Sequence, residues 1–376
     1  MHFTEFLRDL LVILAGAKVC GEVAVRLRQP AVLGELLGGV VVGVSVLRLI
    51  HPHDPTIRNL AELGALVLLF EIGLACNLRD LLKVGARSLV LGVAGIVLPF
   101  VAGYLVMAAR GEPALGSVFV GAALTATSIG ITARVLADLG ALGTKEANIV
   151  IGAAVVDDIL GIVILSVVEG LGETGAVHPA EVARIAGLAI GFVVVAIVLG
   201  QVAAGRLVGI LRRMRSRGVL IVGALGFAFA LALGAHAVGS ATIVGAFTAG
   251  LILARTEPRV EIEHALKPIA DLLVPVFFVS VGAEVDIRLL NPLIPENRPA
   301  LALAGILAAV AIATKWAAGF VVPGRGLRRV AIGAAMVPRG EVGLIFADIG
   351  RRSGLFDDTV FGAILLMIMI TTFVGP

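Results

Sequence analysis

The chain has few cysteines and few charged residues, and both shortages restrict the kind of protein it can be. The two cysteines, Cys20 and Cys76, fall in or beside predicted helices, which excludes a disulfide framework and a cysteine metal motif. Charged residues make up only 15% of the 376 residues, whereas 59% are hydrophobic, which excludes a soluble domain and predicts a polytopic membrane protein. The net charge of +3 does not indicate a substrate, because the basic residues lie mostly in loops. We identify no signal peptide and expect the first span, beginning near Glu5, to be part of the fold.

Apolar runs separated by polar, glycine or proline breaks predict an all-α polytopic protein with thirteen transmembrane helices in one domain, residues 1–376. The predicted spans are roughly 5–25, 31–49, 60–76, 87–109, 114–137, 147–168, 180–204, 218–237, 240–254, 268–285, 299–321, 329–350 and 358–374. Of the 30 basic residues, 18 fall in loops on one side, nine on the other, and Lys18, Lys315 and Arg339 within spans. Because cytoplasmic loops carry the excess of Lys and Arg, we expect the inner membrane, an external N-terminus and a cytoplasmic C-terminus. Neither a further soluble domain nor a nucleic-acid partner is expected.

The sequence contains an internal repeat. The segments 32–39, 61–75 and 126–136 resemble 243–250, 270–284 and 336–346, which lie 211, 209 and 210 residues later. The first repeat covers about 5–168 and the second about 218–374, with the helix 180–204 as a linker. An odd number of helices separates each matched pair, so the second copy is inverted, an arrangement typical of secondary transporters. Chance similarity between glycine-rich apolar segments is the alternative, and three collinear matches weigh against it.

Two adjacent carboxylates lie in the middle of an otherwise uncharged apolar stretch. Asp157 and Asp158 are flanked by the uncharged residues of Asn148–Val168, a stretch of about 20 residues that is long enough to span a bilayer. A charge at the bilayer centre costs roughly 2.5 to 3.5 kcal/mol on insertion scales, so such residues are usually functional. Neighbouring helix positions differ by about 100°, so one carboxylate can pair while the other faces a cavity. An ion or proton site is favoured over carboxylates kept for packing.

Two matched helices contain residues that break a helix. In 114–137, Thr127 and Ser128 precede Gly130, and their hydroxyls can satisfy freed backbone groups. In 329–350, Pro338 lacks an N–H group and is followed by Gly340. We therefore predict two crossing broken helices, the fifth and the twelfth, whose ends can face an ion. A simple proline kink and a small-residue packing face are the alternatives.

Other charged residues within the spans have several interpretations. Lys315 in the eleventh helix needs a carboxylate partner, for which Asp157 is the candidate, unless its amine reaches the cytoplasmic end. Arg339 and Glu341 flank the break in the twelfth helix and have either a structural or a functional role. Glu71 in the third helix is either a second protonatable group or an interface residue, and Asp348 is expected to be structural.

These residues resemble those of the bacterial monovalent cation/proton antiporters of the NapA and NhaA kind. The resemblance to NapA-type members covers nearly the whole chain. The segments that carry it are ELGALVLLFEIGL (62–74), ATSIGITARVLADLG (126–140), GAAVVDDILGIVILSVV (152–168), IVGAFTAGLIL (243–253), TKWAAG (314–319) and PRGEVGL (338–344). The Asp-Asp pair with a lysine in the eleventh helix is the specific part, and members with it are typically electrogenic Na⁺(Li⁺)/H⁺ exchangers.

The resemblance implies a role for each matching residue. Asp158 would bind Na⁺ and H⁺ alternately, and Asp157 would form a salt bridge with Lys315 that loosens when the cation binds. Thr127 and Ser128 would lie beside the site, with Glu341 and Arg339 as supporting charges. The helices 3–6 and 10–13 would form the ion-carrying core, and helices 1, 2, 8 and 9 a panel with the contact of a homodimer. The chain departs from many relatives at Ala75, where they have a glutamate, and has Glu71 one turn earlier.

The predicted function is therefore a secondary active transporter, not an enzyme, that exchanges cytoplasmic Na⁺ or Li⁺ for external protons and needs no cofactor. Exchange of K⁺ for H⁺ on the same fold remains the main alternative, because Na⁺ and K⁺ both bind oxygen ligands. An intramembrane aspartyl protease is disfavoured because its two aspartates would lie on separate helices. A channel would not need the broken pair, and an anion or bile-acid-type symporter would lack the Asp-Asp/Lys set.

Overall fold

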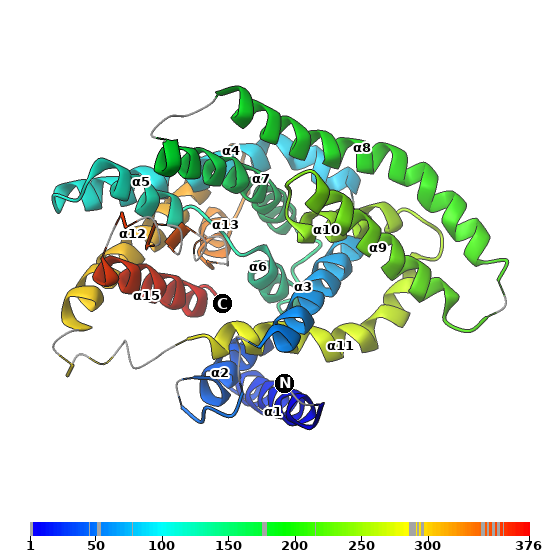
Figure 1. The fold of residues 1–376 in the computed structure, drawn as a ribbon. Coiled ribbons are helices and arrows are strands. Elements are labelled where there is room, and N and C mark those ends of the chain that lie inside the picture. Colours follow the sequence, from blue (N-terminus) through cyan, green and yellow to red (C-terminus); the bar gives the residue numbers. More distant parts are fainter. Residues whose placement is uncertain are drawn as a thin grey trace. The chain divides into compact units, whose positions relative to one another are not determined.

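In a computed structural model the chain folds into helices, and its described residues contain no strand. The structure describes the chain except residues 1–2, 45, 51–53, 77, 175–178, 215, 286–290, 292, 295–296, 340–342, 344–345, 348–349, 352–353 and 356, and the side chains of 78–82, 162, 165–166, 168–174, 179, 181–182 and 185–186. The helices are α1 Phe3–Arg26, α2 Ala31–Val42, α3 Pro55–Ala75, α4 Leu78–Ala109, α5 Ala114–Ala123, α6 Ile129–Asp138, α7 Lys145–Thr174, α8 Pro179–Leu211, α9 Val219–Ala237, α10 Thr242–Leu253, α11 Arg259–Ala283, α12 Arg298–Val321, α13 Arg329–Ala335 and α15 Asp358–Val374 (Figure 1).

Five helical segments among the described residues are long and apolar enough to cross a membrane. They are 83–109, 187–211, 219–237, 259–283 and 298–321. Four shorter apolar helices, α2, α5, α10 and α15, accompany them. Their number and composition make the chain a multi-pass membrane protein.

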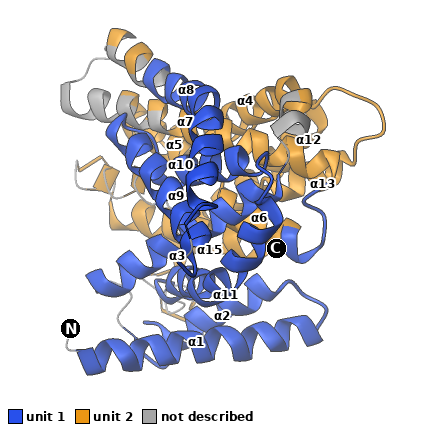
Figure 2. Ribbon diagram, turned by 90° about the vertical axis from the view of Figure 1, so that its right-hand side faces the viewer, with its two compact units in different colours: residues 1–82, 137–143, 187–286 blue, residues 83–136, 144–186, 287–376 orange. Residues whose placement is uncertain are grey.

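The chain divides into two compact units, which Figure 2 colours separately. Unit 1 comprises residues 1–82, 137–143 and 187–286, and unit 2 comprises 83–136, 144–186 and 287–376. Each unit is therefore assembled from segments that are far apart in the sequence.

Glycines allow the helices of unit 1 to approach one another closely. A Cβ atom on Gly39 of α2 would lie 2.2 Å from the carbonyl oxygen of Val279 in α11, and one on Gly282 of α11 would lie 2.0 Å from that of Leu36. The contact of α3 with α10 has the same form: a Cβ on Gly73 would lie 2.3 Å from the oxygen of Phe247, and one on Gly250 would lie 2.3 Å from that of Phe70. Only glycine fits at these positions, as in other closely packed membrane helices.

The second predicted helix is shorter than expected. It was predicted over 31–49, but α2 ends at Val42, and the N–H of Gly43 still donates to the carbonyl of Gly39. A Cβ on Gly43 would lie 2.4 Å from the Cα of Ala283, so α11 approaches the chain where the helix stops. After this point the chain turns back, and the N–H of Leu49 donates to the carbonyl of Val42. The apolar residues Val46, Leu47 and Leu49 therefore belong to a folded turn and not to the helix.

In unit 2, α12 packs against α13 and α15, and it shares with α5 and α15 a core of mostly aliphatic side chains. Phe119 on α5, Leu307 on α12 and Met367 on α15 all belong to this core and are inaccessible to solvent. A second buried group joins Leu91 of α4, Ile149 of α7 and other apolar residues. Together these two cores contain residues of α4, α5, α7, α12, α13 and α15, and most of the polar residues described next lie on these helices or directly after them.

Candidate functional site

The fifth predicted helix is interrupted, as expected. The helix α5 ends at Ala123, and α6 begins at Ile129 after five residues that are not helical. The hydroxyl of Thr125 donates to the carbonyl of Ala122 at 2.8 Å, and the Ser128 hydroxyl accepts from the N–H of Ile131 at 3.4 Å. These side chains satisfy backbone groups at the two sides of the break, which makes the interruption tolerable inside a membrane.

Asp157 on α7 binds the backbone of this break. Its Oδ2 accepts a hydrogen bond of 2.7 Å from the N–H of Thr127. The residue is 3% exposed, whereas the neighbouring Asp158 is only half-buried. The two carboxylates therefore have different surroundings, which agrees with the prediction that they leave the helix in different directions.

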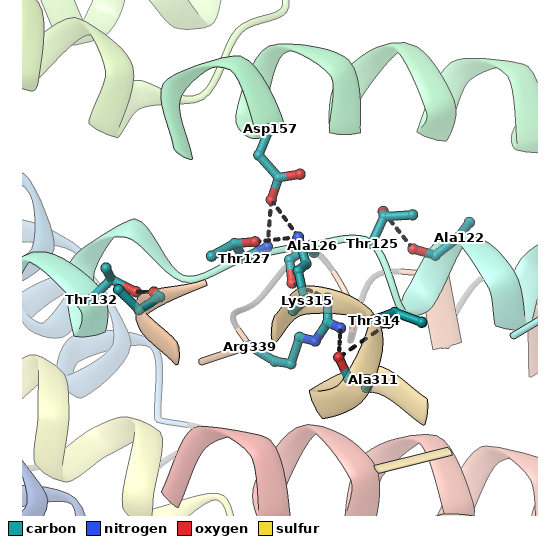
Figure 3. Close-up of polar contacts among 11 residues, drawn as sticks. Ala122, Thr125, Ala126, Thr127, Thr132, Asp157, Ala311, Thr314, Lys315 and Arg339 are labelled. Atoms are coloured by element: carbon teal, nitrogen blue, oxygen red, sulfur yellow. Dashed lines mark hydrogen bonds and ion pairs between the residues drawn. The ribbon is translucent and has the colours of Figure 1, made fainter. Parts of the chain in front are cut away.

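Lys315 on α12 is fully buried and lies next to both Asp157 and Thr127 (Figure 3). Its Nζ donates to Thr127 Oγ1 at 2.6 Å and lies 3.6 Å from Asp157 Oδ2. The structure thus brings together the aspartate and lysine that the sequence predicts as partners. The shorter contact is with the threonine hydroxyl, however, so the ion pair itself is long. Gly95 on α4 leaves room for the amine, because a Cβ there would lie 3.4 Å from Nζ.

The twelfth predicted helix is also interrupted, and the two breaks meet. The helix α13 ends at Ala335, and residues 336–339 are not helical. The N–H of Ser128 donates to the carbonyl of Pro338 at 2.9 Å, and the Thr132 hydroxyl donates to that of Ala335 at 2.8 Å. Hydrogen bonds that each helix loses at its own break are therefore partly replaced by bonds to the other break.

Arg339 directly follows this crossing and is only 1% exposed. Its Nη1 donates to the carbonyl of Ala126 at 3.0 Å, and its Nη2 lies 3.4 Å from the carbonyl oxygen of Ala311 on α12. Its own carbonyl accepts from the Thr372 hydroxyl of α15 at 3.1 Å. Figure 3 shows its side chain beside Lys315. The guanidinium therefore connects the first break with α12.

Three predicted site residues are not among the contacts above. Glu71 is half-buried on α3 of unit 1, and the contacts above are within unit 2. Glu341 and Asp348 lie outside the described residues. Their predicted roles stay predictions.

The sequence did not single out Glu146, at the beginning of α7. Its Oε1 accepts a hydrogen bond of 3.0 Å from the N–H of Arg328, the residue before α13. This bond lowers the pKa of the Glu146 carboxyl below its usual range, with smaller contributions from the charges of Arg328 and Lys145. Glu146 thus connects the beginning of α7, which carries the two aspartates, with the beginning of α13, which ends at the second break. No pattern in the sequence indicated this pairing.

Among the described residues, this group and the adjacent Asp158 contain two acidic and two basic side chains. Asp157 and Asp158 each carry one negative charge when ionised, and Lys315 and Arg339 each carry one positive charge. Among the residues that the structure describes, no cluster of three or more His, Cys, Asp or Glu side chains can hold a resident metal ion. The group offers carboxylate, hydroxyl and backbone carbonyl oxygens instead. These oxygens suit a proton or a hard monovalent cation that binds and leaves.

Known proteins are similar to this chain in sequence and in fold. Residues 10–376 match the family profile described as "Sodium/hydrogen exchanger, transmembrane". The high-affinity Na⁺/H⁺ antiporter NhaS3 of Synechocystis sp. is 43% identical, over 98% of this chain and 88% of that protein. The Na⁺/H⁺-K⁺ antiporter GerN of Bacillus cereus is 34% identical, over 99% of this chain and 95% of GerN. In structure, the sodium proton antiporter MjNhaP1 of Methanocaldococcus jannaschii superimposes with a TM-score of 0.74 over 100% of this chain and 95% of that chain, at 18% identity.

Proposed function

Because the chain belongs to the sodium/hydrogen exchanger family and is a transmembrane cation:proton antiporter, we propose that it is an electrogenic Na⁺(Li⁺)/H⁺ antiporter of the NapA type. It exchanges cytoplasmic Na⁺ for external protons and so contributes to pH homeostasis. The observation that supports this proposal best is the buried contact of 3.6 Å between Lys315 and Asp157, with Asp158 next in the same helix.

In the proposed mechanism, one site holds either protons or a cation. Asp158, which is less buried than Asp157, binds Na⁺ with help from water and from carbonyl oxygens of the break near Thr127 and Ser128. The positive charge of the ion attracts Asp157 and loosens its pair with Lys315. Because the carboxylates and the amine are coupled, they gain and lose protons as a unit. When the site faces the other side of the membrane, protons replace Na⁺.

Electrogenic exchange requires that more than one proton moves for each Na⁺. If Asp158 and Lys315 each release a proton as one Na⁺ binds, two protons move against one cation, and each cycle transfers one net charge. Arg339 and Glu341 act as supporting charges in this scheme, and Glu71 is either a further protonatable group or an interface residue.

The architecture we propose has thirteen spans, an external N-terminus, a cytoplasmic C-terminus and two inverted repeats. The third to sixth and tenth to thirteenth predicted spans form the core. The first, second, eighth and ninth predicted spans (5–25, 31–49, 218–237 and 240–254) form a panel with the homodimer contact.

The glycine contacts of unit 1 support the repeat. Gly39 and Gly250 are 211 residues apart, Gly73 and Gly282 are 209 apart, and these are the offsets found by self-comparison of the sequence. Each contact, α2 with α11 and α3 with α10, is therefore the counterpart of the other.

Exchange of K⁺ for H⁺ is the second candidate. GerN, whose name includes K⁺ as well as Na⁺, is 34% identical to this chain along almost its entire length. Since carboxylate and carbonyl oxygens bind both ions, the residues of the site do not choose between them.

The deciding experiment uses purified protein in proteoliposomes with an imposed pH difference and a pH-sensitive dye. Na⁺, Li⁺ and K⁺ are added in turn to the wild type, to Asp158→Asn and to Asp271→Asn, an exposed aspartate on α11 that serves as a matched control. We expect dequenching with Na⁺ and Li⁺ in the wild type and in the control, and none in Asp158→Asn. Currents on a supported membrane then test whether exchange moves net charge.

Three results would contradict parts of the proposal. A signal with K⁺ alone would assign the protein to potassium efflux, and exchange without current would exclude the electrogenic mechanism. Wild-type rates in Asp158→Asn would remove Asp158 from the ion site.

A further inference from the structure

Arg339 donates to two backbone carbonyl oxygens, of which that of Ala311 also accepts from the Thr314 hydroxyl at 3.2 Å, whereas that of Ala126 lies in the non-helical break. One guanidinium nitrogen lies 3.0 Å from the carbonyl oxygen of Ala126, the residue before Thr127, and another lies 3.4 Å from that of Ala311, one helical turn before Lys315. Each oxygen thus belongs to a residue next to, or one turn from, a group that binds Asp157 or Thr127. A carbonyl oxygen engaged by a guanidinium directs one of its two lone pairs at a positive charge, and the nearby charge makes the oxygen a poor ligand for a second cation.

Arg339 is held in this position from its backbone as well as from its side chain. Its carbonyl accepts from Thr372 of α15, and the preceding carbonyl, that of Pro338, accepts from the N–H of Ser128. The planar fork of the guanidinium suits two acceptors, which an ammonium group reaches less well. Its charge also acts directly on Asp157 and on Lys315.

We propose that Arg339 is a specificity-determining positioning residue, which favours small cations over K⁺ by occupying the carbonyl oxygen of Ala126 in the non-helical break. The inference depends on the cation exchange proposed above and adds a reason for the choice of cation. A larger ion needs more oxygen ligands to replace its hydration shell, and the number of coordinating carbonyls is one determinant of selectivity between K⁺ and Na⁺. With the Ala126 oxygen engaged, the break offers one carbonyl ligand fewer, which disfavours the larger ion more than Na⁺ or Li⁺.

The test compares Arg339→Gln, Arg339→Lys and the wild type in proteoliposomes, with kcat and KM measured separately for Na⁺ and K⁺. Arg351→Gln is the matched control, because Arg351 is about half exposed and pairs with Asp358 away from these carbonyls. We expect the Na⁺/K⁺ ratio of kcat/KM to fall about tenfold in Arg339→Gln, the change that corresponds to one hydrogen bond to a charged group. Arg339→Lys, which keeps the charge but not the fork, should lose less, and Arg351→Gln should lose nothing.

A binding measurement that needs no transport accompanies the kinetics. The thermal stabilisation of the purified proteins by Na⁺ and by K⁺ should differ in the wild type and become similar in Arg339→Gln. If Arg339→Gln does not fold, Thr372→Val decides, since it removes only the hydroxyl that holds the Arg339 carbonyl; it should lower the ratio in the same direction by a smaller factor.

The outcomes separate this inference from the proposed function. No cation exchange by the wild type would refute the proposed function. The inference alone would be overturned if the wild type exchanged cations and Arg339→Gln had the same Na⁺/K⁺ ratio of kcat/KM. If Arg339→Gln does not fold, an unchanged ratio in Thr372→Val would have the same meaning. An equal loss of Na⁺ and K⁺ exchange would show a purely structural role and would also overturn it.

Discussion

The hydrogen bond between Lys315 and Thr127 allows the most specific prediction, because it depends on a single atom, Thr127 Oγ1. Replacing Thr127 with valine keeps the shape of the side chain and the backbone N–H that binds Asp157, and removes only Oγ1. In the wild type that oxygen lies 2.6 Å from the amine of Lys315, whereas the Asp157 carboxylate lies 3.6 Å away. The hydroxyl is therefore the partner that receives the amine when a cation draws Asp157 away.

The magnitude follows from the kind of hydrogen bond that is lost. A hydrogen bond to a charged group contributes about 1.5 to 3 kcal/mol. If Lys315 still carries its proton when Na⁺ draws Asp157 away, and Asp157 replaces the lost hydroxyl in the cation-free state, up to the full amount opposes cation binding. With about 1.4 kcal/mol for each factor of ten, KM for Na⁺ should rise by about 10- to 150-fold.

The assay is dye dequenching in proteoliposomes over a range of Na⁺ concentrations. Thr125→Val is the matched control, because Thr125 is equally buried but its hydroxyl donates to the carbonyl of Ala122 and not to a charged group. Thr127→Ser, which keeps an acceptor oxygen, should restore most of the affinity. If Thr127→Val and Thr125→Val had the same KM for Na⁺, the reasoning about Lys315 would be refuted.

Two further predictions concern stability. Gly250→Ala should destabilise the purified protein by about 1 to 3 kcal/mol in thermal unfolding, because its Cβ would lie 2.3 Å from the Phe70 carbonyl oxygen. The control Gly226→Ala, whose Cβ would meet nothing within 4 Å, should leave the stability unchanged. Equal melting temperatures of the two variants would contradict the close contact. The lowered pKa of Glu146 means that its carboxylate stabilises the fold above its ordinary value of 4.5 and that this stabilisation is lost as the pH falls through the lowered value. Glu146→Gln should therefore melt below the wild type at pH 7, and the difference should shrink on acidification below 4.5; a constant difference would exclude the bond to Arg328 as its cause.

The features predicted best from the sequence follow from composition and charge. A lysine within an apolar span needs a carboxylate partner, and the two adjacent aspartates at the centre of another apolar span include Asp157, so their contact was predictable. The break after α5 was predictable for a similar reason, because clustered hydroxyl residues before a glycine weaken a helix while supplying other hydrogen-bond partners.

The features that escaped prediction depend on the path of non-helical backbone. The hydrogen bonds of Thr127 to both Asp157 and Lys315 require the course of residues 124–128, which no periodic pattern encodes. The partners of Arg339 are carbonyl oxygens, which are present at every residue and so leave no trace in the sequence. The end of α2 at Val42 was missed because a contact with α11, over 200 residues away, overrides an apolar run that continues to 49.

The close contact of α2 with α11 can form only after the ribosome has made the chain between them. Gly39 and Gly282 are 243 residues apart, and a ribosome that adds about 5 to 20 residues per second needs about 12 to 50 s to make the intervening chain. Throughout that interval the glycine face of α2 has no partner from α11, since that helix does not yet exist. The nascent protein therefore spends many seconds in the membrane before α11 can cover Gly39 of α2. During that time lipid or another protein segment has to cover this glycine.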